Sequence, residues 1–375
     1  MLYDKLTEYS KSGVYPMHMP GHKRNMERLP PGLPYNIDIT EVDGFDDLHD
    51  PQGLLLETSR LASGLYGSLD AFLLVNGSTV GILSAIGASA KRGDKALIDK
   101  SAHRSVFNAV ELFGLDPVFI TPQTDPTSGI TCGIGPINVE SALKSNPEIK
   151  LVVVTSPTYE GVISDVGAIS DIAHKHDIPL IVDGAHGAHL DFSEGFSGGA
   201  VRAGADLVVM SLHKTLPALT QCSLLHVNTA RPDINEVKRL LSVLQTSSPS
   251  YVLMASIDSC LRMLISDKDR LFKEYEENLD RFSSMMTRLK KLAVVCHGLD
   301  KQNGRFYNFD RGKLVIVTKN TAISGFMLAD ILRTGHKIEL ELARPGYAVA
   351  MTSVCDSPEG FTRLANALLS IDAGL

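Results

Sequence analysis

The chain has 375 residues, 44% of them hydrophobic, and a formal net charge of −7 at pH 7. This composition predicts a globular protein with one large and one smaller lobe, and the absence of a basic stripe argues against a nucleic-acid-binding protein. No apolar run approaches the roughly 20 residues of a membrane helix, and the first residues lack the apolar block of a signal peptide, so we expect neither.

The first fifty residues are rich in Pro, Gly, His and acidic residues. They predict an irregular N-terminal arm, and its simplest interpretation is a solvated surface loop. Apolar runs then alternate with amphipathic segments. We predict helices over 54–67, 78–93, 103–114, 137–146 and 168–177, and strands over 71–76, 95–99, 117–121, 150–157, 178–186, 205–214 and 222–228. Continuous Val, Ile and Leu runs between helices predict a mostly parallel sheet sandwiched by helices, which is an α/β fold.

The pattern changes after a Ser-Pro-Ser turn near residue 250. A long helix is predicted from 251 to about 292, followed by strands over 313–318 and 338–343 and helices over 324–335 and 360–371. These elements predict a small C-terminal α/β lobe. The expected organisation is an arm (1–50), a large domain (51–250) and a small domain (251–375).

Ligands of open α/β sheets bind at the carboxyl ends of the strands, so the chemistry is expected there. One strand end is followed by a glycine and hydroxyl side chains that open a helix: Asn76, Gly77, Ser78 and Thr79. A helix N-terminus of this kind can hold a phosphate, and the alternative is a tight turn without a ligand. The segment is not a P-loop, because no Gly-Lys-Ser/Thr follows.

Asp183 ends a second apolar run. A carboxylate buried there requires a cation or strong donors, and a helix cap or a structural ion pair is the alternative. His186 and His189 follow, but their spacing does not place them on one helical face at i and i+4, and no further ligand cluster is evident. We therefore expect no metal.

Lys214 follows the apolar run that begins at residue 205 and is flanked by Ser211 and His213. Desolvation at such a place lowers the pKa of a lysine and makes it a candidate for a Schiff base, whereas a solvated lysine needs no core strand behind it. A phosphate cradle, a carboxylate and an amine are together what pyridoxal 5′-phosphate requires. His103, which opens a predicted helix, supplies a ring to stack on the cofactor, with a helix-capping role as the alternative.

Eight collinear stretches between residue 16 and about 258 resemble the fold type I (aspartate-aminotransferase-like) branch of the bacterial ornithine/lysine/arginine decarboxylases. The stretches are MPGHKRN, DITEVDGFDDLHDPQG, FLLVNGSTVG, HRSVFNAVEL, SPTYEGVISDV, VDGAHGAHLDF, GADLVVMSLHKTLPALTQ and QTSSPSYVLMASID. The resemblance implies a pyridoxal-phosphate enzyme in which Lys214 bonds to the cofactor aldehyde and Asp183 pairs with the pyridine nitrogen. It also implies that His103 and Ala185 lie on the two faces of the ring, with His186 close by.

The resemblance implies further roles at matching positions. Four residues surround the phosphate: Ser78, Thr79, Ser211 and His213. Two reach the phosphate site of a partner subunit: Thr246 and Ser247. Four contact or approach the substrate, those of the arm across a dimer interface: His18, His22, Lys23 and Glu341.

Two departures from the family pattern stand out. Gly184 occupies the place of the glutamate in the usual Val-Asp-Glu-Ala-His motif, which removes one carboxylate beside the ring. The family also continues beyond the position of Leu375 with a segment that helps to close the mouth of the active site. The resemblance therefore implies a short form of the family, either naturally short or completed by a part supplied elsewhere.

The predicted function is decarboxylation of lysine, arginine or ornithine to the corresponding amine and CO2 by a cytoplasmic homodimer or higher homo-oligomer in polyamine biosynthesis. Two alternatives remain: another pyridoxal-phosphate enzyme on the same fold (an aminotransferase or lyase), and a non-catalytic cofactor-binding partner of a full-length decarboxylase. The cytoplasmic location agrees with scattered cysteines, expected to be reduced and mostly buried: Cys132, Cys222, Cys260, Cys296 and Cys355.

Overall fold

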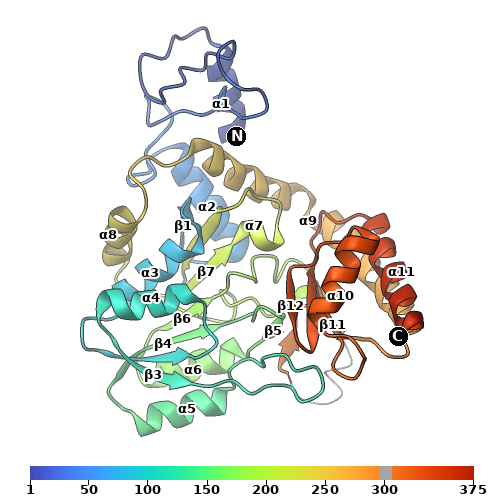
Figure 1. Cartoon of the computed structure of the whole chain (residues 1–375). Helices are drawn as coiled ribbons and strands as arrows, with labels where there is room; N and C mark the ends of the chain where they lie inside the picture. The colour runs from blue at the N-terminus through green and yellow to red at the C-terminus, as the bar shows by residue number, and fades with distance from the viewer. Residues whose placement is uncertain (296–305) are drawn as a thin grey trace.

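The structure is a computed structural model that describes residues 1–295 and 306–375. Within these residues a seven-stranded sheet forms the centre of the larger lobe (Figure 1). The strand order is β1 (Asp70–Leu74), β8 (Ser223–Val227), β7 (Leu207–Ser211), β6 (Leu180–Asp183), β4 (Ile149–Thr155), β2 (Lys95–Asp99), β3 (Asp116–Ile120). β8 pairs antiparallel with β1 and β7, and the other pairs are parallel. The predicted mostly parallel sheet is therefore confirmed.

Helices cover both faces of this sheet. Alternate residues of a strand point to opposite faces, so a strand with continuous apolar residues must be buried on both sides. In β7, Leu207 and Val209 pack into the core on one face, and Val208 and Met210 pack into the core on the other. The first core is completed by α3 (Gly77–Ser89), α4 (Arg104–Phe113) and α8 (Ile234–Leu244). The second is completed by α2 (Leu54–Tyr66), α5 (Pro136–Ser145), α6 (Val166–Lys175) and α9 (Tyr251–Met286). The sandwich expected from the sequence is thus observed.

The smaller lobe is built on an antiparallel sheet in the order β12 (Leu342–Arg344), β13 (Tyr347–Met351), β11 (Lys313–Val317), β9 (Ala293–Val295). Its helices are α10 (Gly325–Ile331), which continues into a π-helical turn (Leu332–His336), and α11 (Pro358–Gly374). The 36-residue helix α9 runs from the larger lobe to the smaller one (Figure 1). A two-stranded pair, β5 (Val162–Ile163) with β10 (Asn308–Phe309), also joins the lobes. We retain the division at residues 50 and 250 as a proposal.

The N-terminal arm differs from the prediction of a solvated loop. Residues Leu2–Lys11 form a helix, α1, in which Leu2 and Leu6 are fully buried. Asp258 of α9 accepts a hydrogen bond from the Leu2 backbone N–H at 3.0 Å and so fixes the start of this helix to the body. Later parts of the arm are open to solvent, as at Met17, which is 87% exposed. The prediction was wrong for α1 because two apolar residues four positions apart bury one face of a short helix.

Several predicted elements have other bounds in the structure, among them two strands and the long helix. The strand predicted over 338–343 is reduced to β12, since Lys337 leaves the π-helical turn with a left-handed φ of 55° and the chain joins the sheet only at Leu342. The strand predicted over 205–214 ends at Ser211, and a short helix, α7 (Leu212–Thr215), carries Lys214. The long helix predicted to residue 292 ends at Met286.

Gly325 allows α10 to contact the β12–β13 hairpin. A Cβ atom at this position would overlap the carbonyl oxygens of Tyr347 and Arg344, whereas a Cβ at Gly335, in the same lobe, would meet nothing within 4 Å. We expect Gly325→Ala to lower the free energy of unfolding by about 3 kcal/mol because the hairpin must move. Gly335→Ala should change the free energy of unfolding by less than about 1 kcal/mol. Guanidinium denaturation measures both, and equal stabilities would contradict the packing described.

Candidate active site

A cavity of about 570 Å³ opens at the carboxyl ends of β2, β4 and β6. Parallel strands bring these ends to one edge of the sheet, so residues that are distant in sequence meet there. Six residues predicted for the cofactor site line the cavity: Ser78, His103, Asp183, Ala185, His186 and Lys214. Leu342 and Arg344 complete its wall from the smaller lobe. The cavity therefore lies between the lobes, with the predicted amine and carboxylate in one wall.

Lys214 lies one helical turn beyond β7 and is half-buried. Its Nζ is 3.1 Å from Nε2 of His186. Burial lowers the pKa of the Lys214 amine, and the carboxylate of Asp183 opposes this shift. A lowered pKa increases the fraction of neutral amine, which is the nucleophilic form.

Asp183 is the last residue of β6 and is buried. Its Oδ1 accepts a hydrogen bond from the Ala185 backbone N–H at 3.2 Å. Burial raises the pKa of the Asp183 carboxyl, and the backbone donor and the nearby Lys214 and His103 lower it. The carboxylate is thus stabilised whenever a cation occupies the adjoining cavity.

His103 serves as a helix cap and as a cavity residue at once. Its Nδ1 accepts a hydrogen bond from the Ser105 backbone N–H at 3.2 Å at the start of α4, and its ring lines the cavity. The two interpretations of His103 given by the sequence are therefore compatible with each other.

The segment before α3 forms the predicted turn. Gly77 has a left-handed φ of 73°, and Ser78 lines the cavity at the helix N-terminus. Asn76 instead uses its Oδ1 to accept a hydrogen bond from the Thr246 backbone N–H at 3.1 Å, which places Thr246 beside α3 of its own chain. Thr79 is exposed and does not line the cavity. The reach of Thr246 and of its exposed neighbour Ser247 into a partner subunit stays a prediction.

Ser211 and His213 flank the lysine without lining the cavity. Ser211 Oγ is buried and has no hydrogen-bond partner among the described residues. Nδ1 of His213 is 3.0 Å from the carbonyl oxygen of Cys222. Ser211 thus keeps an unused hydrogen-bonding group beside the lysine, whereas one ring nitrogen of His213 is occupied by the backbone.

The residues predicted to contact substrate lie outside the cavity wall of this chain. In the arm, Nε2 of His18 is 3.1 Å from Tyr9 Oη, His22 pairs with Asp38, and Lys23 donates to the His18 carbonyl. These contacts are all internal to the arm. Their approach to an active site across a dimer interface stays a prediction.

Glu341 does not line the cavity itself but contacts Tyr159, and its charge also raises the pKa values of Lys214 and Lys313. The Tyr159 hydroxyl donates to the Glu341 carboxylate, and Tyr159 itself lines the cavity. The centroid of the Tyr159 ring is 4.7 Å from that of His186. Glu341 is therefore linked to the cavity wall by one side chain.

The sequence did not single out Lys313, which is 1% exposed at the start of β11. Its Nζ is 2.9 Å from Nδ1 of His186. Burial lowers the pKa of Lys313 to about 8, and Asp310 opposes the shift. Asp310 is itself buried, with Oδ1 3.0 Å from Nε2 of His189. A lysine that opens a predicted strand gives no sign of burial, so only the fold reveals this group.

Glu160 is a second residue that the sequence did not single out. It is buried, lines the cavity, and accepts a hydrogen bond from the Tyr347 hydroxyl at 2.7 Å. It thus adds a second carboxyl group to the wall of the cavity that Asp183 lines.

The side chains of the cavity fit pyridoxal phosphate. Asp183 is available to a ring nitrogen, and Lys214 is an amine with a lowered pKa. Thr155 Oγ1 and Ser211 Oγ are buried at this edge of the sheet with no partner in the described part of the chain, so each keeps an unused hydrogen-bonding group there. A Cβ built on Gly184 would lie 3.3 Å from Val208 Cγ1 and from the Val209 carbonyl oxygen, so a side chain there has little space.

Metal ligands, membrane helices and cysteines were also subjects of the sequence predictions. In residues 1–295 and 306–375, no group of three or more His, Cys, Asp or Glu side chains is arranged to hold a metal. No helix of the described chain has the length and apolar character needed to cross a bilayer. Among the cysteines, Cys222 and Cys260 are buried, Cys132 is half-buried and Cys355 is exposed, and Cys296 lies outside the described residues. The expected burial thus holds for two of them.

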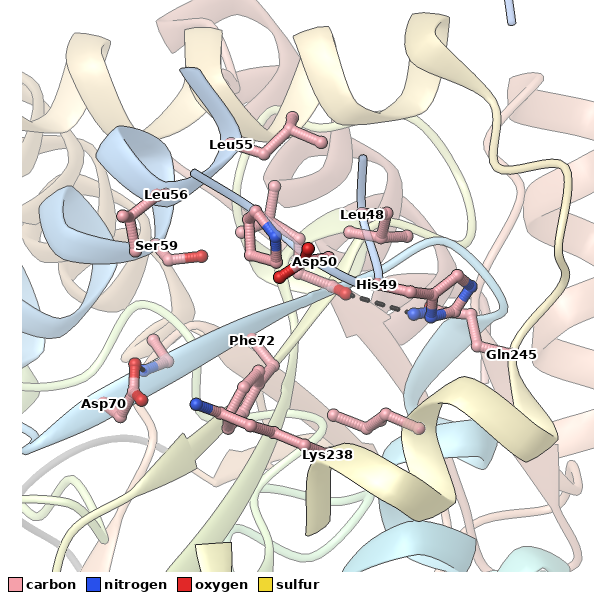
Figure 2. Close-up of a pocket in the computed structure, with 14 residues that line it drawn as sticks. Leu48, His49, Asp50, Leu55, Leu56, Ser59, Asp70, Phe72, Lys238 and Gln245 are labelled. Carbon is pink, nitrogen blue, oxygen red and sulfur yellow. Dashed lines mark hydrogen bonds between the residues drawn. The ribbon is translucent and has the colours of Figure 1, made fainter. Parts of the chain in front are cut away.

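A second cavity, of about 170 Å³, lies against the edge strand β1 (Figure 2). Figure 2 shows the amine of Lys238 directed toward Asp70 at one side, with His49 and Gln245 at the other. None of the residues predicted for the cofactor lines this cavity. The amine, carboxylate and hydroxyl groups required for the predicted chemistry are therefore gathered in the larger cavity.

Known proteins resemble the chain over most of its length. A family model described as "Orn/Lys/Arg decarboxylase, major domain" matches residues 1–321. The arginine decarboxylase of Bacillus subtilis (strain 168) is 32% identical over 378 residues, which cover 99% of this chain and 76% of that protein. The "Uncharacterized protein YaaO" of the same organism is 42% identical over 265 residues, which cover 68% of this chain and 55% of that protein.

Among solved structures, the lysine decarboxylase LdcF of Francisella novicida matches with a TM-score of 0.85 at 18% identity. The match covers 99% of this chain and 60% of that one. At this identity the likeness concerns the fold, and it confirms the predicted fold type I α/β architecture. The chain spans a little over half the length of YaaO and of LdcF.

The buried Lys313 predicts a pH-dependent stability. Its pKa is about 8 in the folded chain and 10.5 in an ordinary environment, so between these values the unfolded chain binds the extra proton and stability rises with pH. We expect the wild-type chain to gain up to about 3 kcal/mol over this range relative to Lys313→Met. Lys273→Met, at an exposed lysine of α9, is the matched control. Guanidinium unfolding at several pH values tests this, and parallel curves for wild type and Lys313→Met would contradict it.

Proposed function

The chain belongs to the Orn/Lys/Arg decarboxylase family, as its motifs predicted, and we propose that it is a pyridoxal-phosphate-dependent decarboxylase of a basic amino acid. The substrate is lysine, arginine or ornithine, and the products are the corresponding amine and CO2. The observation that carries the proposal is that Lys214, with a lowered pKa, shares one cavity wall with the buried carboxyl of Asp183. An amine and a carboxylate in this arrangement suit the aldehyde and the ring nitrogen of the cofactor.

When bound, pyridoxal phosphate supplies an aldehyde that condenses with amines and a ring that withdraws electrons from the substrate α carbon. Asp183 would keep a proton on the ring nitrogen. A buried carboxylate is stabilised by a cation beside it, and the protonated ring nitrogen would be that cation. His103 and Ala185 would hold the two ring faces. Ser78 at the N-terminus of α3 and Ser211 would hold the phosphate. Lys214 or His186 would return a proton to the α carbon after CO2 leaves.

The cavity wall also suits a substrate with a cationic side chain. Glu160 lines it, and Glu341 is linked to it through Tyr159. Arg344 lies in the same wall and can pair with a substrate carboxylate. We propose that the two glutamates attract the distal cation of the substrate, in agreement with the names of the arginine and lysine decarboxylases that the chain resembles.

A homodimer or higher homo-oligomer, a cytoplasmic location and a role in polyamine biosynthesis are parts of the same proposal. Support for an oligomer comes from the arm, where Tyr15, Met17 and Met19 are apolar and exposed. Exposed apolar side chains of this density commonly belong to a protein–protein interface. The arm residues His18, His22 and Lys23 would then approach the site of the second copy.

Decarboxylation is tested with the purified chain, pyridoxal phosphate, and lysine, arginine or ornithine carrying labelled carbon in the carboxyl group. We expect labelled CO2 and the matching diamine or agmatine from at least one of the three. Asp183→Ala should lower turnover by about 10³-fold, since the ring nitrogen loses its carboxylate. Asp177→Ala, at an exposed aspartate of the same lobe, is the control.

A keto acid in place of CO2 would instead identify an aminotransferase. Cofactor binding without turnover of any of the three amino acids would identify a non-catalytic partner of a full-length decarboxylase. Either result would replace the proposed reaction while leaving the cofactor assignment in place.

The bond to Lys214 has a separate test. Borohydride reduction of the chain loaded with pyridoxal phosphate, followed by peptide mass spectrometry, should place a pyridoxyl group on Lys214. Lys214→Ala should carry no label there and should lose the visible absorbance of the bound cofactor. Labelling of other lysines with Lys214 unmodified would reject the cofactor assignment.

A further inference from the structure

Two tyrosine–glutamate pairs cross the junction of the lobes beside the cavity. Tyr159 of the larger lobe donates to the carboxylate of Glu341 in the smaller one. Tyr347, in β13 of the smaller lobe, donates to Oε1 of Glu160 in the larger one at 2.7 Å. Each lobe thus supplies one hydroxyl and one carboxylate to the junction.

The two glutamates differ in their surroundings. Glu160 is 7% exposed and lines the cavity, whereas Glu341 is exposed and lies outside the cavity wall. An exposed carboxylate is solvated without a ligand, but a buried one depends on the groups around it. The carboxylate that a ligand in the cavity would meet is therefore that of Glu160.

The protein itself gives Glu160 few partners. Its carboxylate accepts one hydrogen bond from the described residues, that of Tyr347. At the same junction His189 pairs with Asp310, but no lysine, arginine or histidine of the described chain forms an ion pair with Glu160. Its charge raises the pKa of Lys313 without such a contact. Buried carboxylates are normally paired with a cation or with several donors, so Glu160 has the capacity to bind a cation in the cavity.

The backbone around Glu160 is held in a tight turn. The Gly161 N–H donates to the Thr158 carbonyl at 3.0 Å, and the Thr158 N–H donates to the Val162 carbonyl at 2.8 Å. Gly161 has a left-handed φ of 104°, and a Cβ at this position would lie 2.8 Å from the Cβ of Lys313. The turn and this close packing fix the place from which the Glu160 side chain extends.

The ring of Tyr347 is fixed as well. It is buried and belongs to an apolar cluster with Val162, Val315 and Val349. Burial and the bond to Glu160 raise the pKa of the Tyr347 hydroxyl, so the hydroxyl keeps its proton and remains a donor. A rigid donor limits the carboxylate of Glu160 to the orientations that preserve the hydrogen bond.

We propose that Glu160 is the residue that selects amino acids with a cationic side chain, and that Tyr347 is a positioning residue that orients its carboxylate. The inference deepens the proposed function and rests on it for the place of the substrate in the cavity. The oxygen of Glu160 that Tyr347 does not contact would accept from the ammonium or guanidinium group of the substrate side chain. A ligand of the same length with a neutral end would leave the carboxylate without a cation and would bind less tightly.

The test measures binding of reaction products, which avoids turnover, to the full chain loaded with pyridoxal phosphate by isothermal titration calorimetry. The cationic ligands are cadaverine, putrescine and agmatine, and their neutral-ended counterparts are pentylamine, butylamine and N-carbamoylputrescine. We expect at least one cationic ligand to bind about 10- to 100-fold more tightly than its counterpart. Equal affinities in all three pairs, or no binding of any cationic ligand, would overturn the proposal.

Two variants assign this preference to the residues. Glu160→Gln should weaken binding of the cationic ligand by about tenfold or more and leave that of its counterpart nearly unchanged. Tyr347→Phe should lower the preference in the same direction, because the carboxylate keeps its charge but loses its orientation. In a Glu160→Gln background, Tyr347→Phe should have little further effect. Glu339→Gln and Tyr307→Phe, at exposed residues, are the matched controls and should change nothing.

Three results would contradict the assignment: equal weakening of both ligands in Glu160→Gln, the same loss from Tyr347→Phe in both backgrounds, or a greater loss of preference in Glu341→Gln. Thermal unfolding confirms that each variant is folded. Both main variants are close in shape to the wild type, so a folding failure of one leaves the other as the test.

The release of labelled CO2 separates this inference from the proposed function. A preference that depends on Glu160, with no CO2 from any of the three amino acids, would support the inference and reject the proposed reaction. Release of CO2 with an unchanged preference in Glu160→Gln would reject the inference alone.

Discussion

Four parallel strands of the larger lobe end at one edge of the sheet, and the chemistry of the site depends on that alignment. It brings His103 after β2, Thr155 at the end of β4, Asp183 at the end of β6 and Lys214 after β7 to one cavity region. The smaller lobe adds Leu342 and Arg344 to the wall of the cavity at this edge. Burial disfavours the charged form of both the Lys214 amine and the Asp183 carboxyl. The protonation of each group therefore depends on the charges of its neighbours.

Much of this arrangement could be predicted from local sequence pattern. Apolar runs bounded by helical segments predicted each strand of the large sheet, because burial on both faces requires continuous apolar residues. The polar residues that end those runs then indicated the cavity, as for Asp183 and Lys214. The family motifs added His103, Ala185 and His186, which also lie in the cavity wall.

Other features depend on contacts between distant segments and leave no local pattern. The sequence around Lys313 indicates a solvated lysine at the start of a strand. In the structure, its Nζ instead contacts the ring of His186. Asp310 and His189 meet in the same way. The helix α1 lies in a segment whose composition favours loops, and its contact with α9 buries the face that carries Leu2 and Leu6. Where packing between lobes decides the structure, the periodicity of a single segment carries little information.

The pairs His186–Lys313 and His189–Asp310 lie at the junction of the two lobes, and each joins a histidine that follows β6 to a residue of the β10–β11 segment. All four side chains are buried. Exchange of the C-terminal part for that of a relative that has Lys313 but lacks Asp310 would leave the buried lysine without the carboxylate that favours its charged form. Such a loss costs about 3–5 kcal/mol when a buried charge is left uncompensated. Chimeras of this protein should therefore transfer these four residues as a unit.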